Sequence, residues 1–197
     1  VGMITDVIED SFEEAGIKMA MTFTSPLLPN DLDVLARPVT YVTFDVSSTD
    51  SKPHDVQIYL DAVAESTVHT PDQVVAVAAV QTPGLATVRA GSVGQPVLGR
   101  AGDATRIDWG HLYLSTPQSD GGSAFVGEAD ESRDAFAADG TINTDAKLTP
   151  RPAYRGWPVL GCSINFGKVQ ADAVSKHLMI AYDSVYAVEY LGERLRP

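Results

Sequence analysis

The amino-acid sequence predicts an all-β fold, a two-layer antiparallel β-sandwich of about ten or eleven strands with a few short helical turns. Apolar and polar residues alternate over short segments, which is the period of a half-buried strand. Turn-forming residues, including many of the 16 glycines and 12 prolines, separate these segments. No long segment carries the apolar stripe of a core helix, and the sequence has no internal repeat. A closed barrel has the same composition and remains the alternative.

The first part of the chain predicts one strand and one helical turn. Residues 1–14 are rich in acidic side chains and could form either a turn of helix or a tail. Residues 17–23 alternate strictly between apolar and other side chains, so we expect a half-buried strand there that ends at Ser25 and Pro26. A helical turn is expected over residues 32–36, because Pro38 disfavours the helical conformation in the residue before it.

The segment 38–65 organises the predicted fold. Two alternating runs flank the turn-forming residues 47–54, and their apolar positions are Val42, Phe44, Val46, Val56, Ile58 and Leu60. This pattern predicts a β-hairpin with one apolar face. Burying six such side chains could contribute roughly 1.5–3 kcal/mol each before the entropy of ordering is subtracted. A second sheet must therefore cover that face.

The middle of the chain predicts a strand pair followed by a long loop. Residues 74–80 are almost continuously apolar, as in an interior strand, and residues 85–90 are the expected partner across the Pro83-Gly84 turn. Residues 93–103 contain several glycines and predict a loop. Residues 106–116 predict a further strand, in which Gly110 indicates a bulge or a close backbone approach.

The last third of the chain again predicts strands. We expect a short strand over residues 123–126, a helical turn or irregular edge over 130–138, and a long surface connection over 140–155. Apolar segments at 158–166, 177–182 and 185–190 predict the final strands.

Length and charge limit the classes of function. The 197 residues suit one domain, 1–197, with one well-buried core. The net charge of -12 disfavours broad contact with nucleic acid or anionic lipid. The acidic N-terminus and the lack of a long apolar run predict neither a signal peptide nor membrane insertion. Cys162 is the only cysteine, so neither an internal disulfide nor a zinc site built from several cysteines is expected.

Motifs that would indicate catalysis are missing from the sequence. It contains no Gly-x-Ser-x-Gly elbow, no Ser-x-x-Lys pair and no glycine-rich phosphate loop. No two of the four histidines have the spacing of a helical metal site. We therefore expect no catalytic residue, no metal and no cofactor in this chain.

The cluster Asp108-Trp109-Gly110-His111-Leu112-Tyr113 is the most unusual local sequence. Trp109 could fill the core while Asp108 or His111 satisfies backbone groups, which is the structural interpretation and the favoured one. The other interpretation is a ligand-binding or domain-docking surface formed by Asp108, Trp109, His111 and Tyr113.

Several segments together resemble the N-terminal, non-catalytic part of the glutaminase A family. They are Phe23-Thr24-Ser25-Pro26, Leu32 through Pro38, Tyr41 to Val46, Ser48-Thr49-Asp50, His54-Asp55-Val56-Gln57, Asp108-Trp109-Gly110, Leu112-Tyr113, His177-Leu178-Met179, Tyr182-Asp183 and Tyr190-Leu191-Gly192. The resemblance covers the chain from about residue 17 onward. Two features depart from the family pattern: Ser51 stands where glycine is frequent, and residues 91–103 are poor in aromatic side chains.

The resemblance implies a β-sandwich that precedes an α-helical toroid domain in the same polypeptide. The parent protein would be an extracellular or periplasmic amidohydrolase that converts L-glutamine to L-glutamate and ammonia, with the activity in the helical part. This chain would then be an accessory domain that is inactive alone. Two alternatives remain open: a module that binds carbohydrate or a cell-envelope ligand, and a small hydrolase that uses a carboxylate such as Asp108.

Overall fold

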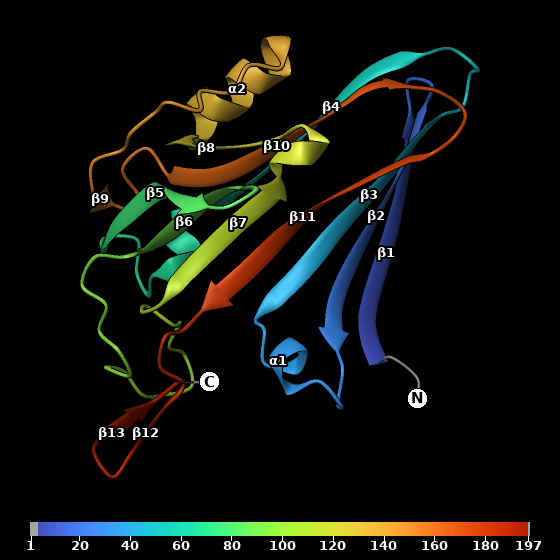
Figure 1. Ribbon diagram of the computed structural model, residues 1–197. Coiled ribbons are helices and arrows are strands. Elements are labelled where there is room, and N and C mark those ends of the chain that lie inside the picture. The colour runs from blue at the N-terminus through green and yellow to red at the C-terminus, as the bar shows by residue number, and fades with distance from the viewer. Residues whose placement is uncertain (1–3, 197) are drawn as a thin grey trace.

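A computed structural model describes residues 4–196, and it confirms the predicted all-β, two-layer antiparallel sandwich (Figure 1). An eight-stranded sheet faces a three-stranded sheet, and a separate two-stranded ribbon projects beyond the end of the sandwich. The described residues form 13 strands, which is more than the ten or eleven expected.

All strand pairs are antiparallel. The large sheet contains, in spatial order, β1 (Ile4–Glu14), β2 (Ile17–Leu27), β3 (Val39–Ser48), β11 (Val174–Asp183), β7 (His111–Pro117), β6 (Leu85–Ser92), β5 (Val74–Thr82) and β9 (Arg151–Pro152). The small sheet contains β4 (His54–Val63), β10 (Pro158–Val169) and β8 (Gly122–Glu128). The ribbon contains β12 (Val188–Tyr190) and β13 (Glu193–Leu195). The helical elements are α1 (Leu32–Leu35), α2 (Ala129–Asp139) and the 3-10 turns η1 (Ala64–Thr67) and η2 (Gln118–Asp120).

The core lies between the two sheets and is built by the alternation in the sequence. Its fully buried large side chains include Val42, Val46, Val75, Val88, Leu114, Leu160, Ile164 and Leu178. Because successive side chains of a strand point to opposite faces, the intervening residues lie on the outer faces. The predicted inward set of β3, namely Val42, Phe44 and Val46, is confirmed.

The hairpin predicted over residues 38–65 is wrong. β3 pairs with β2 and β11 in the large sheet, whereas β4 pairs with β10 in the small sheet. Residues 49–53 therefore carry the chain from one layer to the other as an arch. Asp50 Oδ1 accepts hydrogen bonds from the Ser48 hydroxyl and the Lys52 amide and contacts His54 Nε2 at 2.8 Å. Alternation showed that both strands bury a face in one core, but it does not specify which strand pairs with which.

A second arch lies beside the first. Residues 170–173 connect β10 of the small sheet to β11 of the large sheet (Figure 1). The Ser48 amide donates to the Gln170 carbonyl at 2.7 Å, which joins the two arches. The sandwich is closed at this end by two crossings of the same kind.

The first two strands extend the large sheet beyond the core. Residues 4–14 form β1, and neither a helical turn nor a tail, because they pair along their whole length with β2 through the Ala15-Gly16 turn. Residues 1–3 lie outside the described part. The strand expected at 17–23 is confirmed and continues to Leu27. The helical turn at 32–36 is also confirmed: Asp31 caps α1 by accepting from the Val34 amide at 3.1 Å.

Three further expectations change. The pairing of residues 74–80 with 85–90 is confirmed, but among the described strands β5 has a neighbour on both sides only at Val74 and Val75, where β9 pairs with it, and beyond them it forms the edge of the sheet. The segment 130–138 belongs to an 11-residue helix, α2, rather than to a single turn. The segment 185–190 contributes only the short exposed strand β12.

Helix α2 lies on the outer face of the small sheet. Arg133 reaches β4, where its guanidinium donates two hydrogen bonds to Asp61, at 2.9 and 2.8 Å. Tyr59 donates to the same carboxylate at 2.7 Å, and its ring packs against Phe125 and Phe136. The bidentate ion pair and the aromatic contacts fix the helix on the sheet.

Candidate functional site

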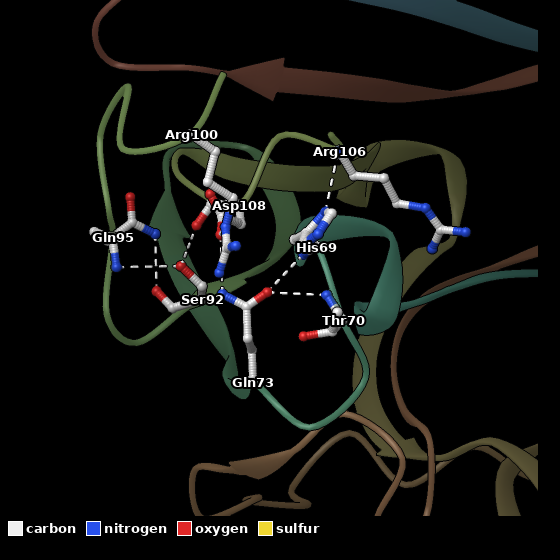
Figure 2. Close-up of polar contacts among 8 residues, drawn as sticks. All are labelled: His69, Thr70, Gln73, Ser92, Gln95, Arg100, Arg106 and Asp108. Atoms are coloured by element: carbon white, nitrogen blue, oxygen red, sulfur yellow. Dashed lines mark hydrogen bonds and ion pairs between the residues drawn. The ribbon is translucent and has the colours of Figure 1, made fainter. Parts of the chain in front are cut away.

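Asp108 is the centre of a polar network at the end of the sandwich where the loop 93–110 joins β6 to β7. Its side chain is wholly buried, with 0% exposure. Oδ2 accepts hydrogen bonds from Gln73 Nε2 at 3.0 Å and from Arg100 Nε at 2.9 Å (Figure 2). The Ser92 hydroxyl donates to the Asp108 backbone carbonyl. A buried carboxylate needs such partners, because an unpaired charge loses its hydration.

The second oxygen, Oδ1, has no hydrogen-bond partner among the described protein groups. The charge of Asp108 is balanced through the other oxygen by the Arg100 guanidinium, whose side chain remains 43% exposed. Asp108 therefore forms the buried half of an ion pair whose cationic half lies at the surface.

Two glutamines fasten the loop 93–110 to the strands beneath it. Gln73 Oε1 accepts from the backbone amides of His69 and Thr70 at 2.7 and 3.0 Å, so this side chain joins the segment 69–73 to Asp108 (Figure 2). Gln95 Oε1 accepts from the Gly110 amide at 2.7 Å, and its Nε2 donates to the Ser92 carbonyl at 2.8 Å. Both ends of the loop are thus held.

Trp109 connects this loop to the root of the β12–β13 ribbon. Its indole Nε1 donates to the Tyr186 carbonyl at 3.3 Å, and the Tyr182 hydroxyl donates to the Trp109 carbonyl at 2.6 Å. Burial raises the pKa of Tyr182 to about 12, and the nearby Asp108 charge adds to the shift. The Tyr182 phenol is therefore a stable donor at neutral pH.

Gly110 allows two backbone segments to meet. Its φ is +83°, and a Cβ at this position would overlap the Asp183 carbonyl oxygen and approach Ser184 Cα to 2.8 Å. The close backbone approach predicted for Gly110 is confirmed. It seats the β7 strand against the turn that leads into the ribbon.

His111 and Tyr113 lie on a different surface from Asp108. They alternate on β7 with the buried Leu112 and Leu114, so they face outward from the large sheet. Their rings are 6.2 Å apart between centroids and half-buried. Asp108 and Trp109 join neighbouring segments, but Trp109 is half-buried rather than part of the core, and the Asp108 carboxylate accepts from the Gln73 and Arg100 side chains rather than from backbone groups. A binding role for the four predicted residues stays a prediction.

The partners of Asp108 are not evident from the local sequence, since Gln73 lies 35 residues before it. Arg100, eight residues before Asp108, is close enough in the sequence to have been a candidate counter-ion. No local pattern marks Gln95 and Tyr182 as members of this cluster, because only the strand pairing brings them to it.

The histidine on β7 predicts a pH dependence of stability. Burial, and next the Arg89 charge, lower the pKa of His111 from its ordinary 6.5. Below about pH 6.5 the unfolded chain therefore binds a proton more readily than the folded one, and stability falls as the pH falls toward the folded pKa. Urea unfolding between pH 7.5 and 5 should show a steeper loss for the native protein than for His111→Gln. Equal slopes for the two proteins would contradict this prediction.

Two further features bear on chemistry, namely the one cysteine and the possible metal ligands. Burial raises the pKa of the Cys162 thiol to about 12, so it stays protonated. Residues 4–196 contain no cluster of three or more histidine, cysteine or carboxylate side chains that could hold a metal ion. A cavity of about 310 Å³ lies between β8, α2 and the segment 141–148; Glu128, which lines it, pairs with Arg151.

Among the helices of residues 4–196, none has both the length and the apolar character required to cross a bilayer.

Three comparisons place the chain among known proteins. Over 179 residues it is 28% identical to Glutaminase A of Aspergillus oryzae (strain ATCC 42149 / RIB 40), an alignment that covers 90% of this chain and 25% of that protein. The chain thus spans about a quarter of the curated relative and is distantly related to its N-terminal region. A solved structure named "Putative kojibiose phosphorylase from human microbiome" matches 88% of this chain and 17% of that chain, with 7% identity and a TM-score of 0.41. A family model described as "Domain of unknown function (DUF5127)" matches residues 10–197, and the chain therefore belongs to this family.

Proposed function

We propose that this chain is the non-catalytic β-sandwich domain of a glutaminase A-like amidohydrolase. The observation that carries the proposal is the asymmetry of the alignment with Glutaminase A, which covers 90% of this chain but only 25% of the relative. The parent protein would hydrolyse L-glutamine to L-glutamate and ammonia outside the cell or in the periplasm. An α-helical toroid domain in the same polypeptide would hold the reactive groups.

The chemistry of the buried carboxylate supports an accessory role. Amide hydrolysis needs a nucleophile or general base that faces the substrate. Asp108 is the carboxylate that the alternative of a small hydrolase would use, but its side chain is wholly buried and Oδ2 already accepts from Gln73 and Arg100. The other oxygen, Oδ1, has no donor among the described residues, but it is buried as well, so a substrate would have to open the loop to reach it. The network is better suited to holding the loop 93–110 than to proton transfer.

An ammonia-release assay tests the proposal. Residues 1–197, shown by near-ultraviolet circular dichroism to be folded, should release ammonia from L-glutamine at less than about one-thousandth of the rate of the longer polypeptide, since catalysis contributes many orders of magnitude. A rate near that of the longer protein would place the activity in this domain and contradict the proposal.

A further inference from the structure

The β12–β13 ribbon exposes an unusual amount of apolar surface. Figure 1 shows it projecting from the end of the sandwich, and among the described strands β12 pairs only with β13. Four of its side chains are exposed: Val188 by 51%, Tyr190 by 64%, Leu191 by 88% and Leu195 by 46%. Single exposed apolar residues are common, but four on one short ribbon form a patch, and such patches mark interaction sites.

The tip of the ribbon carries a leucine where the backbone disfavours it. Tyr190 pairs with Glu193, so the loop contains only Leu191 and Gly192, whose φ values are +50° and +82°. Two positive φ values define a type I′ turn, whose first central position strongly favours asparagine, aspartate or glycine. A leucine in the left-handed region costs roughly 1–2 kcal/mol. At 88% exposure its side chain recovers little of that cost within this domain.

The root of the ribbon is tied to the sandwich by a hydrogen bond, and its two strands are joined at their base. Trp109 Nε1 bonds to the Tyr186 carbonyl, and the Ala187 amide donates to the Leu195 carbonyl at 2.9 Å. The Arg196 guanidinium lies 5.9 Å from the centre of the Tyr186 ring. The Trp109 contact connects the root of the ribbon to the residue next to Asp108, and the other two contacts close the base of the ribbon.

We infer that the β12–β13 ribbon is a docking arm that inserts Tyr190 and Leu191 into an apolar pocket on the remaining part of the longer polypeptide. The inference rests on the proposed function. The curated relative is about four times as long as the aligned segment, so a partner in the same polypeptide has the necessary length. The family match includes the ribbon, since it extends to residue 197.

The charge of the ribbon fits an apolar partner surface in a protein. On a chain of net charge -12, the ribbon carries two acidic residues, Glu189 and Glu193, and one basic residue, Arg194, and Arg196 follows it directly. Glu189 and Arg194 lie 3.4 Å apart as a pair. A net charge near zero lowers the electrostatic cost of burying the ribbon, and without a cationic excess it gains no attraction to anionic lipid.

Hydrogen exchange in the longer polypeptide tests the docking arm. Amides of residues 188–195 should exchange at least about tenfold more slowly there than in the isolated chain, because docking buries them. Leu191→Asn should abolish that protection, although asparagine suits the type I′ turn and should leave the melting temperature of the isolated chain unchanged or higher. Tyr190→Ser should also reduce the protection. Leu32→Asn replaces a leucine of α1 that is 73% exposed and should not change ribbon exchange.

The outcomes separate this inference from the proposed function. Equal ribbon exchange in the two proteins, or full protection in Leu191→Asn, would contradict the docking arm even if the isolated chain is inactive. The ribbon of residues 1–197 alone could become protected as the protein concentration rises, with dimers in sedimentation velocity. That result would show that the ribbon binds a second copy of the chain, and it would also overturn the docking arm. Glutamine hydrolysis by residues 1–197 would instead contradict the proposed function and leave the docking arm untouched.

Discussion

Asp108→Ala should destabilise the domain by about 3 kcal/mol, measured as the loss in free energy of unfolding in urea. Removing one partner of a buried ion pair typically costs about 3–5 kcal/mol, because the other partner is left without its counter-charge. The low end applies because the Arg100 side chain is 43% exposed and water can solvate its guanidinium. The Gln73 amide, which also donates to Asp108, loses its acceptor as well.

Two variants separate the network from a general effect of charge. Asp103→Ala removes an exposed carboxylate from the same loop and should change the stability by less than about 0.5 kcal/mol. Asp108→Asn keeps one acceptor oxygen and the shape of the side chain, so it should cost less than the alanine variant, about 1–2 kcal/mol. A loss below about 0.5 kcal/mol for Asp108→Ala would show that the loop 93–110 is held by other contacts.

The inward faces of most strands could be predicted from the sequence, but their partners could not. Val42, Phe44 and Val46 were placed in the core by alternation alone, and all three are buried. The same period describes a hairpin and an arch equally well, since both bury one face of each strand. Which sheet β4 joins depends on β10, about 100 residues later in the chain, where Ile164 pairs with Ile58. This long-range pairing leaves no local pattern.

Helix α2 was underestimated although its end signals are present. Asp130 and Glu131 stand in the first turn, and Gly140 ends the helix with a φ of +75°. Its apolar stripe is weak, because Phe136 is the only large apolar residue in it. The helix is stabilised instead by the Arg133–Asp61 pair, which no periodicity reveals.

The candidate cluster was found by its composition, and its role depended on neighbours from distant strands. Trp109 is one of only two tryptophans, so its segment attracts notice in the sequence. The partner of the indole, Tyr186, lies 77 residues later, and only the pairing of β7 with β11 brings the two together. Local sequence could therefore indicate an unusual cluster, whereas the partners that its residues contact became visible only in the three-dimensional structure.

Gly110→Ala should cost about 2–5 kcal/mol in the free energy of unfolding, through two separate effects. A φ of +83° is strained for alanine by roughly 1–2 kcal/mol. The added Cβ would also overlap the Asp183 carbonyl oxygen, and overpacking against backbone adds about 1–3 kcal/mol. Because Asp183 and Ser184 lead into the ribbon, its amides should exchange faster in this variant than in the native chain, while exchange in β1 and β2 should not change.

Gly84→Ala is the matched control, since Gly84 has a similar φ of +74° but no heavy atom lies within 4 Å of the position of the added Cβ. It should cost only the strain of about 1–2 kcal/mol. The difference between the two variants then measures the close approach of the backbone at Gly110. Equal losses would show that the chain relaxes there freely, and the ribbon root could not be held in one direction. A docking arm requires that direction to be fixed. We therefore expect Gly110→Ala to lose clearly more free energy of unfolding than Gly84→Ala.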